Sequence, residues 1–171
     1  MYVDLIVPVI GSVVIATGLL SEVRGFSFSS ALAYAGMLLL HLCGYINLVD
    51  SSLAFWGIAA LLACGIALLS PREEPGGAGK GNLYLLLGAV AGLLVGMSID
   101  ASVMIFSAII GTLLGEFFYS CTPKGRWVKF SISIFIHYFC SVGLKIIVST
   151  AIAGIVTEGF LRNRDYYLVG G

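Results

Sequence analysis

The chain has 171 residues, of which 59% are hydrophobic and only 11% are charged, with nine basic side chains balancing nine acidic ones. A water-soluble domain carries about a quarter of its residues as charges. The composition therefore excludes a soluble globular enzyme, a disordered chain and a nucleic-acid binder with a basic face. It is the composition of an integral membrane protein.

Six apolar runs have about the 20 residues that a helix needs to cross the hydrocarbon core. They cover residues 2–20, 28–49, 52–69, 83–99, 101–119 and 130–156. Because the runs are continuous rather than alternating, they favour helices over the strands of a membrane barrel. We expect an all-α, polytopic membrane protein with six transmembrane helices in two three-helix halves, the whole of 1–171 forming one membrane domain.

Polar residues between the runs predict the connections. Residues 21–25 close the first run, and residues 70–82, rich in Pro, Gly and charges, predict a linker between the halves. Only Asp100 separates the fourth run from the fifth, which predicts a tight helical hairpin over 83–119. Two shallow half-helices that re-enter from one side are the alternative.

The basic residues predict the orientation, because cytoplasmic loops carry an excess of Lys and Arg. Loops one, three and five hold six of them: Arg24, Arg72, Lys80, Lys124, Arg126 and Lys129. The C-terminal tail holds two, Arg162 and Arg164. We therefore expect the odd-numbered loops in the cytoplasm and both termini outside. The first run carries Asp4 in place of a basic leader, so we expect it to persist as a helix rather than be removed as a signal peptide.

Small residues recur at every fourth position in the fourth and fifth runs. They are Gly88, Gly92 and Gly96, followed by Ser107, Gly111 and Gly115. On a helix this spacing lines one face, where another backbone can approach closely. We expect the two faces to meet as a glycine zipper that packs the hairpin. The functional alternative is a smooth surface on which helices slide or which lines a narrow conduit.

With this spacing, residues 79–150 resemble the small glycine-rich bacterial inner-membrane proteins of the domain-of-unknown-function family numbered four-five-six. The resemblance is carried by residues 88–96 and 110–116, and by Gly143-Leu144-Lys145, which is similar to that family's lysine-bearing final helix. It implies a multi-pass protein of the bacterial inner (plasma) membrane. The family has no assigned activity, so the resemblance implies none.

Charged residues inside the runs are candidate functional groups, because an ionisable side chain in hydrocarbon is costly unless it is partnered. Two roles fit Glu116, near the cytoplasmic end of the fifth run: an interfacial partner of Lys124 or Arg126, or a proton or cation site. Lys145 reaches either the outer acidic residues or Glu116, depending on where the sixth helix enters the membrane. We expect an intramembrane Glu116–Lys145 ion pair.

Two histidines, His41 and His137, also lie inside runs. Each fits a neutral imidazole that hydrogen-bonds a neighbouring helix, and His137 also fits a proton relay with Glu116. The four cysteines lack metal-ligand spacing, and no nucleophile, phosphate-loop or metalloprotease motif occurs. We expect no enzyme activity, no cofactor and no metal site.

Two functions remain as expectations. One is a small transporter or channel-like protein with ion or proton coupling through Glu116, Lys145 and His137. The other is a non-transporting structural or assembly module of the cell envelope. A water-filled cavity reaching Glu116 favours the first, whereas dry packing around a closed ion pair favours the second. The expected partners are the lipid bilayer and a second copy in a homodimer, with no nucleic acid and no substrate indicated.

Overall fold

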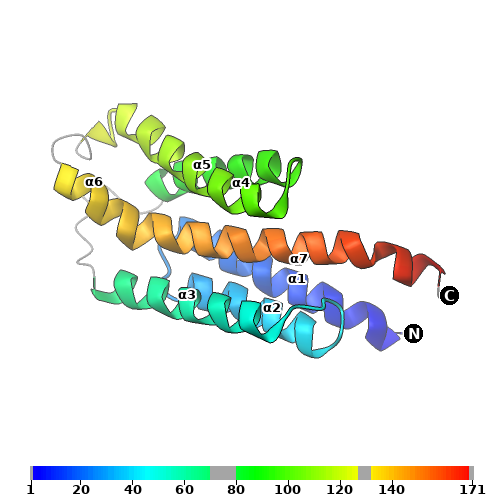
Figure 1. The fold of residues 1–171 in the computed structure, drawn as a ribbon. Coiled ribbons are helices and arrows are strands. Elements are labelled where there is room, and N and C mark those ends of the chain that lie inside the picture. The colour runs from blue at the N-terminus through cyan, green and yellow to red at the C-terminus, as the bar shows by residue number, and fades with distance from the viewer. Residues whose placement is uncertain (1, 70–79, 127–131, 170–171) are drawn as a thin grey trace.

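The computed structural model is helical throughout most of the residues it describes, which are 2–69, 80–126 and 132–169. Its elements are α1 (Tyr2–Val23), α2 (Ser29–Leu42), α3 (Asp50–Leu69), α4 (Lys80–Met97), α5 (Ala101–Cys121), α6 (Ile132–Tyr138), the π-helical segment η2 (Phe139–Gly143) and α7 (Leu144–Val169). Since α6, η2 and α7 follow one another without a break, they form one continuous rod (Figure 1). No strand occurs in these residues.

Four of the helical segments are long and apolar enough to cross a membrane. They are Ile6–Val23 of α1, Asp50–Leu69 of α3, Val103–Cys121 of α5 and Ile136–Arg162 of the rod. Two shorter apolar helices, Ser29–Leu42 and Gly81–Met97, lie among them.

Helix α7 is the centre of the molecule. It contacts α1, α2, α3, α4 and α5, whereas the strongest pairings among the other helices are α4 with α5 and α1 with α2. In Figure 1 the α4–α5 hairpin lies on one side of α7 and the first three helices lie on the other. The start of α1 and the end of α7 lie at the same end of the bundle.

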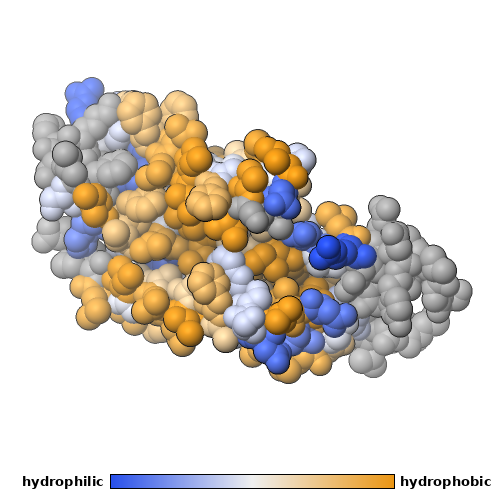
Figure 2. Space-filling model, viewed as in Figure 1, coloured by the Kyte–Doolittle hydropathy of each residue, from blue (hydrophilic) through white to orange (hydrophobic). Residues whose placement is uncertain are grey.

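The outward-facing side chains are largely apolar. Large side chains such as Val13 on α1, Phe55 and Leu61 on α3, and Phe106 on α5 are more than half exposed. In Figure 2 hydrophobic residues cover the middle of the visible face, and hydrophilic residues gather towards its two ends. A contiguous apolar surface of this extent is unfavourable in water and is suited to contact with lipid.

Helix α2 ends earlier than the run 28–49 predicts. Gly44 has a φ of +78°, and the amides of Gly44 and Tyr45 donate to the carbonyls of His41 and Leu40. This is the Schellman arrangement, in which a glycine in the left-handed region terminates a helix. The apolar run therefore continues as a connection, although its composition is that of a helix.

Two other predicted boundaries fall at the edges of the described residues. Most of the predicted linker 70–82 lies outside them, and the described chain resumes with Lys80 as the first residue of α4. The start of the sixth run at 130 also lies outside them. The rod continues past residue 156 to Val169, so the helix extends beyond the end of the predicted apolar run.

The backbones of α4 and α5 approach closely at their glycines. At five positions an added Cβ would run into backbone atoms of the facing helix: Gly88, Gly92, Gly96, Gly111 and Gly115. Gly88 and Gly111 lie opposite each other, each against the carbonyl oxygen of the other, and Gly92 lies against the carbonyl of Ser107. The small-residue faces of the two helices are thus in direct contact along the hairpin.

We expect Gly92→Ala to lower the free energy of unfolding by about 1–3 kcal/mol, the usual cost of overpacking a close contact. The matched control is Gly65→Ala on α3, where nothing lies within 4 Å of the added Cβ. That change should be neutral or should stabilise by about 0.5–1 kcal/mol, because alanine favours the helix over glycine. Denaturant titration in detergent micelles measures both, and equal stabilities for the two variants would contradict the close approach.

Candidate functional site

Lys145, near the start of α7, forms a buried ion pair with α1. Its Nζ lies 3.5 Å from Oε2 of Glu22 and donates a hydrogen bond of 3.1 Å to the carbonyl of Phe26. Both partners are removed from solvent, with Lys145 3% and Glu22 0% exposed. The ion pair connects the first and last helices of the chain.

Hydrogen bonds extend this pair to α4 and α6. The hydroxyl of Ser149, one turn beyond Lys145, donates to Oε1 of Glu22 at 3.0 Å. The amide Nδ2 of Asn82 on α4 donates to the backbone carbonyl of Glu22 at 2.8 Å, and the hydroxyl of Tyr138 on α6 donates to Oδ1 of Asn82 at 3.1 Å. We call these five residues (Glu22, Lys145, Ser149, Asn82 and Tyr138) the Glu22 network.

The end of α1 shapes the network. Gly25 has a φ of +71°, and the amides of Gly25 and Phe26 donate to the carbonyls of Glu22 and Ser21. This second Schellman arrangement turns the chain sharply after the last turn of α1. The turn places the Phe26 carbonyl beside the Glu22 carboxylate, so both acceptors reach the same Lys145 ammonium.

The predicted Glu116–Lys145 ion pair is wrong, and the reason is helical rotation. Gly154 on α7 faces α5, where an added Cβ would meet Met104. Residues nine positions apart lie on opposite faces of an α-helix, since each residue turns it by about 100°. Lys145 therefore points away from α5 and towards α1. The prediction used only the depth of each residue in the membrane. Depth does not specify the direction in which a side chain points around the helix axis.

Glu116 is buried, and no described residue pairs with its carboxyl group. Its side chain is 0% exposed, and neither carboxyl oxygen accepts or donates a hydrogen bond among the described residues. Lys124 and Arg126, its interfacial partners in the alternative interpretation, are both exposed in the segment after α5. A carboxyl group in this position loses its hydration and gains no hydrogen bond from the described residues in return.

The two histidines lie apart from Glu116. His137 is exposed on α6, so the structure does not bring the predicted relay together. His41 instead holds the connection between α2 and α3, because its Nδ1 lies 3.2 Å from the carbonyl of Ile46 and 3.4 Å from the amide of Leu48. Among the described residues, no group of three or more His, Cys, Asp or Glu side chains could hold a metal ion.

Of the Glu22 network, only Lys145 is identifiable as a site residue from the sequence. Hydropathy places Glu22 at the close of the first run and gives no role to Asn82, Tyr138 or Ser149. A usable signal is present, because Glu22 lies two residues after the apolar run 2–20 and the helix continues to Val23. A carboxylate at the end of a membrane helix is a natural complement for a lysine that must be partnered.

We expect Lys145→Met to destabilise the protein by about 3–5 kcal/mol, because it leaves the Glu22 carboxylate buried without its counter-charge. The double variant Glu22→Gln/Lys145→Met should recover most of this loss. A double-mutant cycle on unfolding in detergent measures the coupling, and strictly additive effects would show that the two charges do not depend on each other.

A scan against protein-family models, a search of curated proteins and a search of solved structures each found no match for this chain. The resemblance of residues 79–150 to the glycine-rich inner-membrane family stays a prediction, carried by the spacing of their glycines and by Lys145.

Proposed function

We propose that the protein is a small six-span transporter or channel-like protein of the bacterial inner membrane, with proton coupling through Glu116. The observation that carries this proposal is the carboxyl of Glu116, which is fully buried and has no hydrogen-bond partner in the described part of the chain. Ionisable groups inside membrane helices are rare, and they commonly mark ion pathways and proton relays.

The chemistry of the site favours a proton over a metal cation. Calcium takes six to eight oxygen ligands and magnesium requires six in octahedral geometry. Glu116 supplies two carboxyl oxygens, and within residues 2–69, 80–126 and 132–169 no neighbour is hydrogen-bonded to them. A proton requires a single oxygen, and the binding of one removes the charge whose burial is costly.

The other predicted transport residues take different parts in this proposal. Lys145 belongs to the Glu22 network, where an ion pair and hydrogen bonds fix it in place. It positions α7 against α1 and is not part of the proposed proton path. His137 is exposed on α6 and lies apart from Glu116, so it is not part of the proposed proton site.

The arrangement of the helices supports six spans. In Figure 1 successive long helices run in opposite directions, and the ends of α1, α3 and α5 lie at one end of the bundle. Among the described residues, four basic residues lie at that end: Arg24, Lys124 and Arg126 in the connections, and Lys80 as the first residue of α4. The positive-inside rule then assigns this end to the cytoplasm and both termini to the outside.

A non-transporting structural or assembly module is the second candidate. The closed Glu22 network favours it, because its charges are neutralised and buried in a manner that needs no substrate. In that case the burial of Glu116 lowers the stability of the protein, and the rigid bundle tolerates this loss. The two candidates differ in whether Glu116 exchanges protons with water.

We expect purified protein in vesicles to carry a proton flux that Glu116→Gln abolishes, because the amide cannot release a proton. A pH-sensitive dye inside the vesicles measures the flux. Background flux in both wild type and variant would contradict transport and leave the structural module.

Labelling with dicyclohexylcarbodiimide provides a second readout. A protonated carboxyl adds across a C=N bond of this apolar reagent, and the adduct rearranges to a stable N-acylurea without losing atoms. Glu116 should be labelled, whereas the ion-paired Glu22 is an internal control that should not be. Peptide mass spectrometry locates the adduct, and labelling of Glu22 with no labelling of Glu116 would contradict the assignment.

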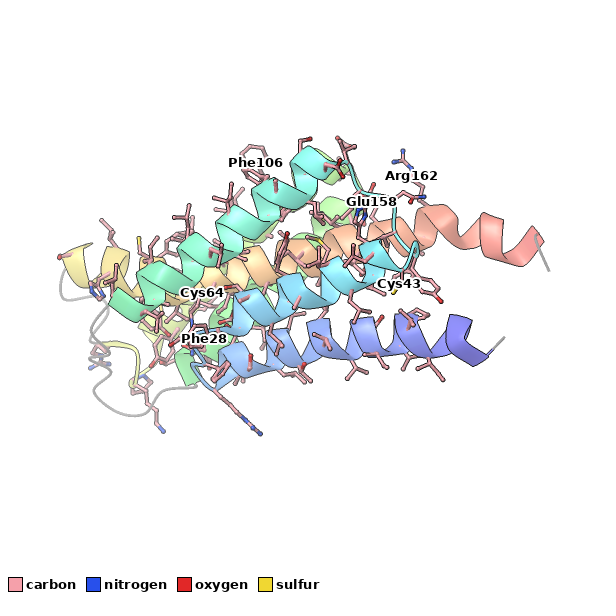
Figure 3. All side chains as sticks on the ribbon, turned by 90° about the horizontal axis from the view of Figure 1, so that it is seen from below. Phe28, Cys43, Cys64, Phe106, Glu158 and Arg162 are labelled. Carbon is pink, nitrogen blue, oxygen red and sulfur yellow. The ribbon has the colours of Figure 1, made fainter. Side chains whose placement is uncertain are left out.

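Two exposed cysteines at opposite ends of the bundle test the orientation. Cys43 follows α2 and Cys121 ends α5, and Figure 3 shows Cys43 at the opposite end of α2 from Phe28. An impermeant maleimide should label Cys43 in intact cells, and Cys121 only after permeabilisation. The reverse pattern would place both termini in the cytoplasm.

A further inference from the structure

One face of α5 is buried along most of its length. Residues at every fourth position make up this face, and all are at most 1% exposed: Met104, Ala108, Thr112 and Glu116. Positions four apart on a helix lie above one another. Met104 lies against Gly154 of α7, so this is the face that α5 turns towards α7.

A second unpartnered polar atom lies on the facing side of α7. Thr150 is 2% exposed, and its hydroxyl forms no hydrogen bond among the described residues. It lies one turn before Gly154, whose Cα faces Met104, and therefore on the same side of α7.

The missing hydrogen bond sets Thr150 apart from the other membrane-helix threonines. The hydroxyls of Thr17, Thr112 and Thr157 each donate to a carbonyl three or four residues earlier in their own helix, at 2.7–2.8 Å. That bond is the ordinary way to satisfy a hydroxyl in a membrane helix. The Thr150 hydroxyl is left able both to donate and to accept.

Two contacts fix the register between α5 and the rod. The rings of Tyr119 and Tyr138 stack with centroids 6.2 Å apart, and Met104 lies at Gly154. Because the two segments run in opposite directions, Glu116 lies level with η2, which α5 contacts. Thr150 lies level with Ala108, one turn from Thr112. Glu116 and Thr150 are then about 12 Å apart along the bundle axis, at 1.5 Å per residue.

We propose that Glu116, Thr112 and Thr150 form a polar track between α5 and α7 along which protons travel, with Thr150 as its second exchanging group. This inference rests on the proposed function and names the path for the proton that Glu116 binds. A proton from cytoplasmic water binds the Glu116 carboxylate. The protonated carboxyl then releases its proton to water molecules that are hydrogen-bonded to the two threonine hydroxyls, and the proton leaves to water outside. Each hop breaks one O–H bond and forms another, and the Glu116 carboxylate is regenerated, so the cycle needs no oxidant, reductant or leaving group.

An apolar cluster closes the outer end of the polar track. Leu93, Met104 and Ala108 pack together there, and Gly154 lies against the side chains of the first two. Beyond it on α7 lies the half-buried Glu158, which Figure 3 shows close to Arg162 near the outer end. The long, unbranched side chain of Met104 can change rotamer at low cost, which suits a barrier that opens transiently.

The test compares Thr150→Val, which removes the hydroxyl at nearly constant volume, with Thr150→Ser, which keeps it. Thr157→Val is the matched control, because Thr157 lies on the same helix, exposed and bonded to Ala153. Proton flux, carbodiimide labelling of Glu116 and unfolding in detergent are measured for each. We expect Thr150→Val to reduce flux at least tenfold, about 1.4 kcal/mol in barrier height, while Glu116 stays labelled and the fold stays stable. Thr150→Ser and Thr157→Val should conduct as wild type does.

Each outcome decides between the two proposals. Undiminished flux in Thr150→Val, together with loss of flux in Glu116→Gln, overturns the polar track and leaves the proposed function standing. Absence of flux in the wild type overturns both. Equal loss of flux in Thr150→Val and Thr157→Val assigns the effect to general weakening of α7, and this also overturns the track.

Discussion

The cost of placing charge in a low-dielectric interior governs this structure. The chain buries Glu22 and Lys145 almost completely, and it compensates by bringing them within 3.5 Å of each other. The attraction within such a pair offsets the cost of removing both charges from water only when hydrogen bonds satisfy their other donor and acceptor atoms. The carbonyl of Phe26 and the hydroxyl of Ser149 supply those bonds, so the turn after α1 and the position of α7 depend on each other.

The remaining helices are organised around this connection. Lipid offers little hydrophobic drive for helices to associate, so close backbone contact must contribute instead. The α4–α5 hairpin obtains it where Gly88 meets Gly111, and the opposite side of the hairpin packs on α7 through larger residues such as Leu93 and Met104. The hairpin thus packs on α7 as one unit. Glu116 is enclosed at that docking surface and not in the centre of the Glu22 network.

Hydropathy predicted the all-helical architecture because composition alone decides whether a segment is stable in lipid. The small residues of the hairpin were identifiable for a similar reason, since a period of four fixes a helix face without knowledge of its neighbours. Pairings between distant helices were not identifiable in this way. Lys145 was recognised as needing a partner, but choosing Glu22 over Glu116 requires the rotation of α7, which hydropathy does not contain. Likewise, Gly44 ends α2 through a backbone conformation that the apolar run around it conceals.

The π-helical segment η2 changes the direction in which side chains project from the rod. In an uninterrupted α-helix, residues seven apart project in nearly the same direction. Tyr138 and Lys145 are so spaced, yet one reaches Asn82 on α4 and the other Glu22 on α1. The additional residue in a π turn rotates the next part of the helix by about 100°, which divides the two side chains between neighbours. The number of residues in 139–143 therefore matters more than the identity of their side chains. Deleting one of them would rotate Tyr138 and Lys145 relative to each other, so that they could no longer reach Asn82 and Glu22 together.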